Sequence, residues 1–246
     1  MLKEERLELI IKMLAKKKVL TIKDVAQALQ TSSSTIRRDF DTLCEHGDVK
    51  RVHGGIASLH QIGEKQLTGT ALVKDRLCHM VAAHIEEGSC IFVDGGTTFR
   101  TLLDHLKDKK VKIVTNNHLL VANQQQGKAE VIYVGGIYDY TYYVSTGSMT
   151  LETISQFSFD VALITCEGYA IEENSLYAAD VNIAGPKQLA IQRARSAFLV
   201  MEERKIGISG FYKFASIDEF CDVFIDKDTH ELKLDEDTIV HSLEDN

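Results

Sequence analysis

A short loop rich in glycine and threonine is the first candidate for chemistry in this sequence. It follows the apolar run 90–93 and precedes a helical pattern that carries Leu102, Leu103 and Leu106. Glycines let backbone N–H groups approach an anion closely, threonines add hydroxyl donors, and the helix N-terminus adds partial positive charge. The loop is therefore a candidate phosphate cradle, and the alternative is a tight strand-to-helix connection. Its residues are Asp94, Gly95, Gly96, Thr97 and Thr98.

Two further strand ends carry polar or glycine residues. Thr115 and Asn116 end a second apolar run, and Gly135 and Gly136 follow a third. Ligands of open α/β sheets bind at the carboxyl ends of the strands, where such residues meet. Neither pair is distinctive singly, because paired glycines are more often a turn than a site.

A second constellation is a predicted helix near the N-terminus that begins after Ser32. Ile36, Phe40 and Leu43 recur at helical spacing and face a core, and Gly47 can end the helix in a left-handed conformation. Arginines on the opposite face can donate to guanine or clamp a phosphate, and hydroxyls can reach backbone oxygens or base edges. A solvated polar face on a small helical domain is the alternative. The outward residues are Ser33, Ser34, Thr35, Arg37 and Arg38.

The surrounding pattern gives this helix a context. Residues 3–17 predict an amphipathic first helix, Thr21 can cap a second, and the polar turn 30–32 separates the second helix from the third. Two short helices around a tight turn place the second one in the major groove of DNA. Residues 48–57 then alternate strand-like and basic residues, Arg51 and His53 included, around a Gly-Gly turn, which predicts a β-hairpin wing.

The charge is distributed unevenly along the 246 residues. The whole chain carries a net charge of -8. Residues 1–60 hold 11 Lys and Arg against 8 Asp and Glu, a net +3, whereas the remainder holds 17 against 28, a net -11. A basic N-terminal segment on an acidic body is typical of a DNA-binding module joined to another domain, because phosphate contacts need only local positive charge.

At this point the N-terminal residues resemble a known family. The run Thr35-Ile36-Arg37-Arg38-Asp39-Phe40, then Leu43 and Gly47, then Arg51-Val52-His53-Gly54-Gly55 closely resembles the signature of the DeoR family of bacterial regulators. The similarity covers residues 3–58. It implies a repressor or activator, usually of a sugar-metabolism operon, in which a winged helix-turn-helix grips operator DNA.

Beyond residue 72 the pattern changes to apolar strand-like runs that alternate with helical ones. Buried runs of this kind favour a mostly parallel sheet covered on both faces, so the fold class is α/β. The expected strands are 90–93, 111–115, 131–134, 161–165, 197–201 and 223–225.

The second half also resembles the DeoR effector domain, through the loop 94–98, the Thr115-Asn116 pair and the paired glycines. That domain is similar in fold to sugar-phosphate isomerases and coenzyme A transferases and binds phosphorylated sugars. By the same resemblance Lys187 and Lys205 match two basic positions of the family, which implies contacts to a phosphate or sugar oxygen; exposed, solvated lysines are the alternative.

Toward the C-terminus the resemblance weakens. Where the family commonly has a small residue, aspartate and glycine, this chain has Cys166-Glu167-Gly168, and in place of aspartate, two serines and lysine it has Glu202-Glu203-Arg204-Lys205. An unusual ligand would be consistent with these departures. The run Tyr138, Tyr140, Tyr142 and Tyr143 suits a lid over a sugar, a packed surface or a subunit contact.

Domain boundaries follow from these patterns. We expect a winged helix-turn-helix over 1–58, a linker over 59–72, an effector and oligomerisation domain over 73–230, and a partly ordered acidic tail over 231–246. No run reaches the length of a membrane span and no signal peptide is indicated, so a cytoplasmic location is expected.

No cofactor and no metal are expected. The five cysteines are scattered and form no CxxC pair, and the histidines lack the spacing of a metal site. The expected partners are double-stranded operator DNA, a phosphorylated sugar effector and further copies of the chain, because one winged domain rarely gives enough specificity alone.

Two other functions stay open. One is an isomerase-like enzyme acting on sugar phosphates, in which Asp94 or Glu167 supplies a base and Lys187 or Lys205 stabilises an enolate. A DNA-binding N-terminal domain has no use in such an enzyme. The other is a constitutive DNA-binding protein whose second domain only oligomerises.

Overall fold

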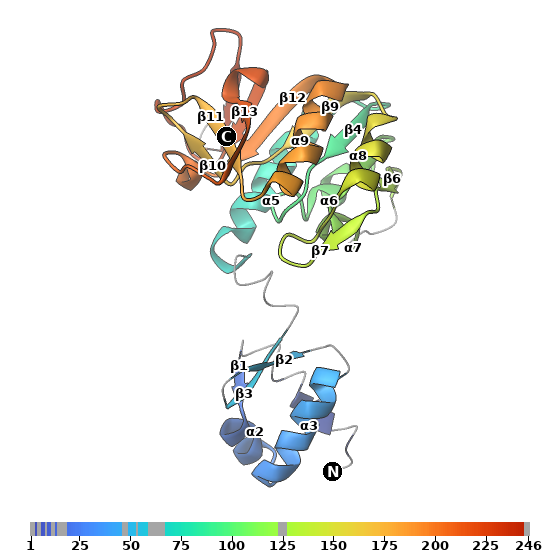
Figure 1. Cartoon of the computed structure of the whole chain (residues 1–246), viewed down its shortest axis with the longest axis vertical. Coiled ribbons are helices and arrows are strands. Elements are labelled where there is room, and N and C mark those ends of the chain that lie inside the picture. Colours follow the sequence, from blue (N-terminus) through green and yellow to red (C-terminus); the bar gives the residue numbers. More distant parts are fainter. Residues whose placement is uncertain are drawn as a thin grey trace. The chain divides into compact units, whose positions relative to one another are not determined.

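The computed structural model describes residues 3, 6, 7, 9, 10, 13, 19–45, 49–52, 54–58, 67–122 and 127–243. The chain divides into two compact units, Met1–Thr70 and Ala71–Asn246 (Figure 1). Each unit has its own apolar core. None of the described helices is both long and apolar enough to cross a membrane.

The first unit confirms the two predicted helices of the helix-turn-helix. They are α2 (Ile22–Ala28) and α3 (Ser33–Glu45). The Oγ1 atom of Thr21 accepts a hydrogen bond from the Asp24 amide at 3.1 Å, and Ser32 Oγ accepts one from the Thr35 amide at 3.2 Å, so both predicted N-caps are confirmed. The described residues of the predicted first helix are helical, and its other residues and Gly47 lie outside the described part.

A three-stranded antiparallel sheet completes the first unit, with β3 (Gly55–Ser58) between β1 (Val19–Thr21) and β2 (Val49–Val52). The β2–β3 pair is the predicted wing. Gly54 has a φ of 74°, which suits glycine at a tight turn. A Cβ on Gly55 would lie 2.1 Å from the Leu20 carbonyl oxygen, so Gly55 permits the close approach of β1 to β3.

The second unit is built on a seven-stranded sheet in which every neighbouring pair is parallel. The predicted parallel α/β fold and all six predicted strands are thereby confirmed, with strand ends that differ by no more than three residues from the prediction. The strand order is β15-β14-β12-β9-β4-β5-β6. The strands are β4 (Cys90–Val93), β5 (Lys112–Thr115), β6 (Glu130–Tyr133), β9 (Phe159–Ile164), β12 (Ala194–Met201), β14 (Asp222–Ile225) and β15 (Ile239–Ser242).

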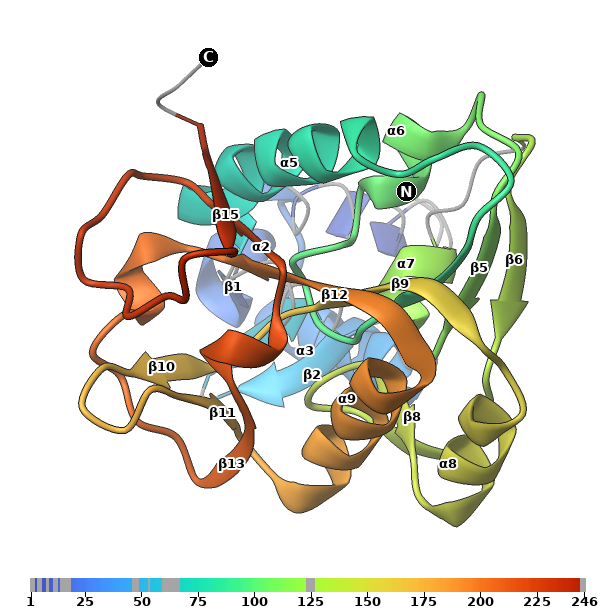
Figure 2. The same ribbon diagram turned by 90° about the horizontal axis from the view of Figure 1, so that it is seen from above.

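Helices cover both faces of this sheet (Figure 2). Successive strand residues point to opposite faces, so in β4 Ile91 joins the core beneath α5 (Leu67–Ala83) and α6 (Leu102–Leu106), whereas Phe92 joins the other core. That other core includes residues of α8 (Ser148–Ser155) and α9 (Val181–Arg193). The carboxyl ends of the central strands thus lie between two packed layers.

Two smaller strand systems were absent from the sequence prediction. One is a three-stranded antiparallel sheet of β10 (Gly168–Ala170), β11 (Ser175–Ala178) and β13 (Tyr212–Ser216). The other is the hairpin of β7 (Ile137–Asp139) and β8 (Val144–Thr146), which contains the tyrosine run. The remaining elements are α7 (His118–Ala122) and the 3-10 turns η1 (Glu203–Lys205) and η2 (Ile217–Glu219).

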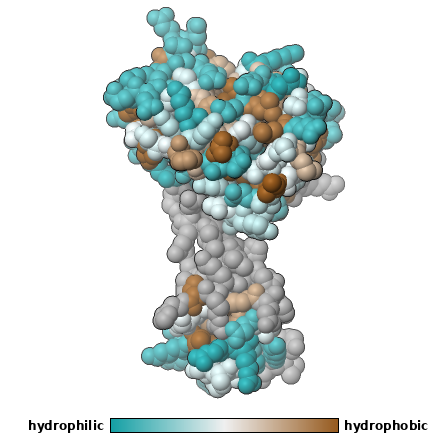
Figure 3. All heavy atoms as spheres, viewed as in Figure 1, coloured by the Kyte–Doolittle hydropathy of each residue, from teal (hydrophilic) through white to brown (hydrophobic). Residues whose placement is uncertain are grey.

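The segment 231–246, predicted as a partly ordered acidic tail, contains a strand that was not predicted, β15, which pairs in parallel with β14. Leu243 is also buried. The strand was not predicted because acidic residues dominate the segment and its apolar run is short. Pairing with one neighbouring strand is enough to stabilise such a run. α5 begins at Leu67, within the segment 59–72 that was predicted as a linker. Apolar side chains remain exposed on the second unit (Figure 3), with the largest exposed fractions at Tyr140, Phe211, Ile137 and Leu72.

Candidate functional site

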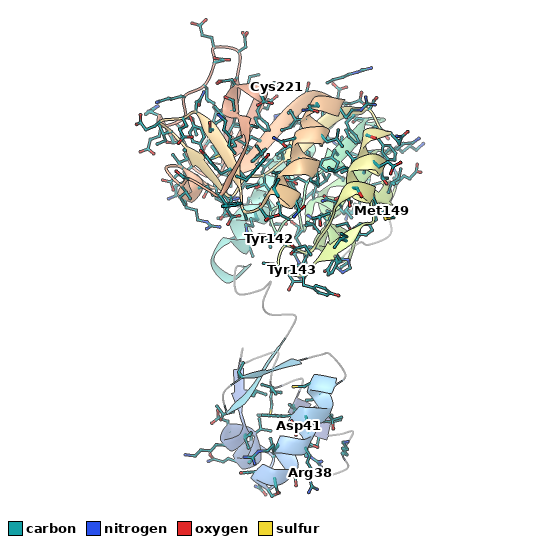
Figure 4. All side chains as sticks on the ribbon, in the orientation of Figure 1. Arg38, Asp41, Tyr142, Tyr143, Met149 and Cys221 are labelled. Carbon is teal, nitrogen blue, oxygen red and sulfur yellow. The ribbon has the colours of Figure 1, made fainter. Side chains whose placement is uncertain are left out.

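The outer face of α3 carries the predicted DNA contacts. Ile36, Phe40 and Leu43 are buried in the first core, and this phase leaves the predicted contact residues on the other side of the helix. Arg38 projects from that side (Figure 4). Ser33, Ser34, Arg37 and Arg38 are exposed, and Thr35 is partly exposed. A helix with one buried and one hydroxyl- and arginine-bearing face matches the recognition helix of a helix-turn-helix.

The wing supplies the rest of the predicted interface. Arg51 lies in β2, its side chain is not among those described, and His53 lies outside the described residues. One residue that sequence reasoning did not select fixes the geometry of α3. The carboxylate of Asp39, 1% exposed, accepts two hydrogen bonds from Arg6, at 2.5 Å and 2.9 Å, and so ties the first helix to α3.

The glycine-threonine loop lies at the carboxyl end of β4, as predicted. Gly96 has a φ of 100°. Within the described part of the chain, the backbone N–H groups of Gly96, Thr97 and Thr98 donate no hydrogen bond. Consecutive unpaired N–H groups around a left-handed residue form a nest for an anion. The side chain of Asn117 holds the nest in shape, because its Nδ2 donates to the carbonyls of Asp94 at 3.0 Å and Gly96 at 2.9 Å.

The predicted contribution of a helix N-terminus is not part of this geometry. α6 begins only at Leu102 and has five residues, and a turn separates it from the loop. A phosphate cradle in this loop would therefore depend on backbone N–H groups and on nearby cations.

Lys187 and Lys205, predicted only through family resemblance, both reach the loop's neighbourhood. Lys187 Nζ forms an ion pair with Asp94 and donates to the Thr165 carbonyl at 3.0 Å. Lys205 Nζ donates to Thr165 Oγ1 at 3.2 Å and to the Cys166 carbonyl at 2.5 Å. Since Thr165 Oγ1 also lies 3.4 Å from Thr98 Oγ1, Thr165 links both lysines to the loop.

A third lysine, which the sequence analysis did not select, completes the cluster. Lys74 on α5 is 5% exposed, and its Nζ donates to Thr97 Oγ1 at 2.7 Å. Burial lowers the pKa of Lys74, and the Glu202 carboxylate at 3.6 Å offsets part of that effect. Nothing in the sequence around Lys74 distinguishes it from other lysines on a helix. It reaches the loop only because the fold places α5 beside the end of β4.

Glu202 is the anionic partner of this third lysine. Burial opposes its ionisation, but hydrogen bonds from Arg204, at 2.9 Å and 3.0 Å, and the charge of Lys74 outweigh burial, so the pKa of Glu202 is lowered. Four cations, Lys74, Lys187, Lys205 and Arg204, thus surround two carboxylates, those of Asp94 and Glu202. Cations thus gather beside the loop, as a phosphate site requires.

The other predicted contacts are placed differently. Thr115 Oγ1 donates to the Val93 carbonyl at 2.6 Å and accepts from the Asn117 amide at 3.0 Å. Its proton is therefore already used in a hydrogen bond within the protein. Gly135 accepts a hydrogen bond from Thr150 through its carbonyl. A Cβ on Gly136 would lie 2.1 Å from Thr150 Oγ1, so this glycine permits close packing against α8.

The second polar residue of its pair, Asn116, is 3% exposed and has one unsatisfied atom. Its Nδ2 donates to the Ser145 carbonyl at 2.8 Å, whereas its Oδ1 has no hydrogen-bond partner among the described residues. Among the described residues, no three His, Cys, Asp or Glu side chains lie together in a way that could hold a metal ion.

The tyrosine run lies on the hairpin β7–β8, which packs against the loop. A Cβ on Gly95 would lie 2.3 Å from Val144 Cγ1, so Gly95 is needed for this contact. Tyr143, labelled in Figure 4, comes just before Val144. Its φ of 55° is rare for a bulky residue. The aromatic rings of Tyr138 and Tyr140 pack edge to face, with their centroids 4.8 Å apart.

Both halves of the chain match known protein families. Residues 6–62 match the family model of the DeoR-like helix-turn-helix domain, and residues 70–227 match that of the DeoR C terminal sensor domain. The chain is 32% identical to an uncharacterized HTH-type transcriptional regulator, FruR, of Bacillus subtilis, over 96% of this chain and 95% of that protein. It is 24% identical to a lactose phosphotransferase system repressor of Staphylococcus aureus, over 93% and 94% of the two chains.

Among solved structures, a ribose 5-phosphate isomerase of Methanocaldococcus jannaschii aligns with 56% of this chain and 55% of its own, with a TM-score of 0.41 and 10% identity. The family is settled by the two domain matches together with the full-length relatives. The chain belongs to the DeoR family of transcriptional regulators.

Proposed function

We propose that this regulator represses an operon of sugar uptake or metabolism and that its second unit senses a phosphorylated sugar. The observation that carries the effector assignment is the set of three unpaired N–H groups, those of Gly96, Thr97 and Thr98, beside buried lysines. Such a site is complementary to a phosphate, because it offers hydrogen-bond donors and positive charge together. The printed name of the staphylococcal relative, a lactose phosphotransferase system repressor, supports the link to sugars.

The phosphate would take the loop N–H groups, with Lys74, Lys187 and Lys205 around it. Lys205 has no carboxylate within salt-bridge distance among the described residues, so it is the lysine best able to turn toward a ligand. Lys74 already donates to Thr97 and needs only a small displacement to bind a phosphate oxygen. The roles of Thr115, Gly135 and Gly136 as effector contacts stay predictions.

On the DNA side, Ser33, Ser34, Thr35, Arg37 and Arg38 would enter the major groove on α3. Arg51 and His53 would follow the phosphate backbone from the wing. Two copies of the chain would read two half-sites, which is how helix-turn-helix proteins reach operator specificity. An effector changes operator affinity only if it binds the DNA-competent and DNA-incompetent conformations unequally.

We infer that the pocket senses and does not turn over its ligand. Asp94, the residue best placed to act as a base, already accepts hydrogen bonds from Lys187, from the Gly95 amide at 2.7 Å and from the Thr165 amide at 3.0 Å. These three donors hold the carboxylate against the backbone of the loop and of residue 165, so its contacts maintain the loop.

The deciding experiment measures operator affinity and turnover on the same protein. An operator is selected from random duplexes, and its Kd is measured with and without a panel of hexose and pentose monophosphates. A shift of the Kd by at least one of these, with no isomerisation of any, is the expected result. Isomerisation at a steady rate would defeat the sensor assignment. Operator affinity unaffected by every phosphate would favour a constitutive DNA-binding protein.

A further inference from the structure

The one buried side-chain acceptor without a partner among the described residues lies beside the proposed phosphate cradle. It is Oδ1 of Asn116, at the carboxyl end of β5. The amide cannot simply be turned over, because its Nδ2 donates to the Ser145 carbonyl at 2.8 Å, and the reverse orientation would put two oxygens together. Leaving a buried acceptor unpaired is energetically unfavourable.

The position of this oxygen connects it to the loop. A Cβ added at Gly95 would lie 4.0 Å from Asn116 Oδ1 and 2.3 Å from Val144 Cγ1. The oxygen therefore lies close to Gly95, the residue before Gly96 in the loop, and Val144 of the hairpin β7–β8 packs beside the same glycine.

The neighbouring asparagine provides a contrast. Asn117 donates to two loop carbonyls through Nδ2, and its Oδ1 accepts from the amides of Leu119 at 3.0 Å and Leu120 at 3.3 Å. Its amide is fully used to hold the backbone. Asn116 is buried as deeply but keeps one acceptor unused, which a structural role alone does not require.

We propose that Asn116 Oδ1 accepts a hydrogen bond from a hydroxyl of the effector and so selects phosphorylated ligands that carry a hydroxyl near the phosphate-binding loop. This inference rests on the proposed phosphate site and adds the part of the ligand that is not phosphate. A hydroxyl can donate to this oxygen, whereas inorganic phosphate bound in the cradle leaves it unpaired. Because Val144 packs beside the same glycine, we expect binding to shift the hairpin locally.

The test compares inorganic phosphate with sugar phosphates on the full-length protein by titration calorimetry. The probes are inorganic phosphate, glucose 6-phosphate, fructose 6-phosphate and ribose 5-phosphate, with 2-deoxyglucose 6-phosphate and 2-deoxyribose 5-phosphate as analogues that lack one hydroxyl. The quantity of interest is the ratio of the Kd of inorganic phosphate to that of the tightest sugar phosphate.

Asn116→Leu, nearly equal in size, is expected to lower this ratio about tenfold or more while leaving the Kd of inorganic phosphate close to that of the wild type. Asn117→Leu is the matched control. It is expected to weaken inorganic phosphate and sugar phosphates alike, because it releases the loop, and to leave the ratio unchanged. If Asn116→Leu does not melt cooperatively, Asn116→Ser replaces it, since a serine hydroxyl can still donate to the Ser145 carbonyl.

The outcomes separate the two proposals. An unchanged ratio in the Asn116 variant, with sugar phosphates still bound, overturns the hydroxyl contact and leaves the phosphate site intact. Wild-type protein that binds none of the phosphorylated probes overturns both. Where the wild type distinguishes a sugar phosphate from its deoxy analogue and the Asn116 variant no longer does, the hydroxyl that Asn116 reads is identified.

Discussion

Lys187 on α9 forms a buried ion pair with Asp94, the residue that opens the glycine-threonine loop after β4, across 93 positions of sequence. The two residues are 4% and 2% exposed. Asp94 also accepts hydrogen bonds from the Gly95 and Thr165 amides, so one carboxylate joins the ends of two neighbouring strands, β4 and β9, to a helix. The ion pair thus fixes the position of the residue with which the loop begins.

Breaking this pair from one side should destabilise the second unit. Lys187→Met keeps the length of the side chain but leaves the Asp94 carboxylate buried and unpaired, which typically costs about 3 to 5 kcal/mol. We expect a lower urea midpoint for the second unit. The double variant Lys187→Met with Asp94→Asn removes both charges and should recover most of the loss. Equal stability of the single and double variants would show that the two charges are not coupled.

Much of this architecture could be predicted from the sequence because it depends on local patterns. The N-caps at Thr21 and Ser32 and the run 90–93 each carry their signal within a few residues. The loop 94–98 was recognisable for the same reason. Its position at a strand end follows from the parallel sheet.

The partners of that loop could not be found in this way. Lys74, Thr165 and Asn117 reach the site from separate elements and stand in no motif. Glu202 stands where the family motif departs, and its sequence position gave no sign that it pairs with Lys74. The strand β15 was missed because a four-residue strand at the edge of a sheet is stabilised by its neighbour β14 and not by its own composition. Such contacts depend on chain topology, which local periodicity does not encode.

Arg38→Ala should weaken operator binding without unfolding the protein. Arg38 is exposed on the outer face of α3, and the loss of a charge-assisted contact costs about 1 to 3 kcal/mol. A contact to phosphate also contributes to the salt dependence, so the slope of log Kd against log salt should become shallower. The measurement is fluorescence anisotropy on the selected operator and on random DNA at several salt concentrations.

A matched control for Arg38 is Arg195→Ala, which removes an arginine whose side chain is 85% exposed on the second unit. It should leave operator affinity unchanged. Equal weakening for operator and random DNA would assign Arg38 to phosphate anchoring, and an affinity equal to that of the wild type would exclude it from the interface.

The lowered pKa of Glu202 predicts a pH dependence of stability. In the folded state Arg204 and Lys74 hold this pKa below its ordinary value of 4.5. The unfolded chain therefore binds a proton more readily, so the stabilisation from ionised Glu202 is fully present above about pH 4.5 and is lost as the pH falls through the folded pKa. Glu202→Gln should flatten the stability profile in this acidic range, measured by urea unfolding at a series of pH values. The exposed Glu172→Gln should keep the wild-type slope.

Gly96→Val should uncouple sensing from DNA binding. Gly96 has a φ of 100°, a conformation that a β-branched residue adopts only with strain, and its N–H is one of the unpaired donors of the nest. A valine there should distort the nest and obstruct the approach of a phosphate. The first unit, with its own core, is untouched, so operator affinity without ligand should equal that of the wild type.

Gly88→Val separates strain from site loss, because Gly88 has a similar φ of 90°, lies in a turn before β4, and has no atom within 4 Å of an added Cβ. Both variants should lose stability through backbone strain, but only Gly96→Val should lose the effect of a sugar phosphate on operator Kd. A Gly96→Val protein that responds to sugar phosphate as fully as the Gly88→Val protein would place the effector elsewhere. Since ligand can change operator affinity only through unequal binding to two conformations, loss of the response with retained DNA binding is the specific signature of a damaged effector site.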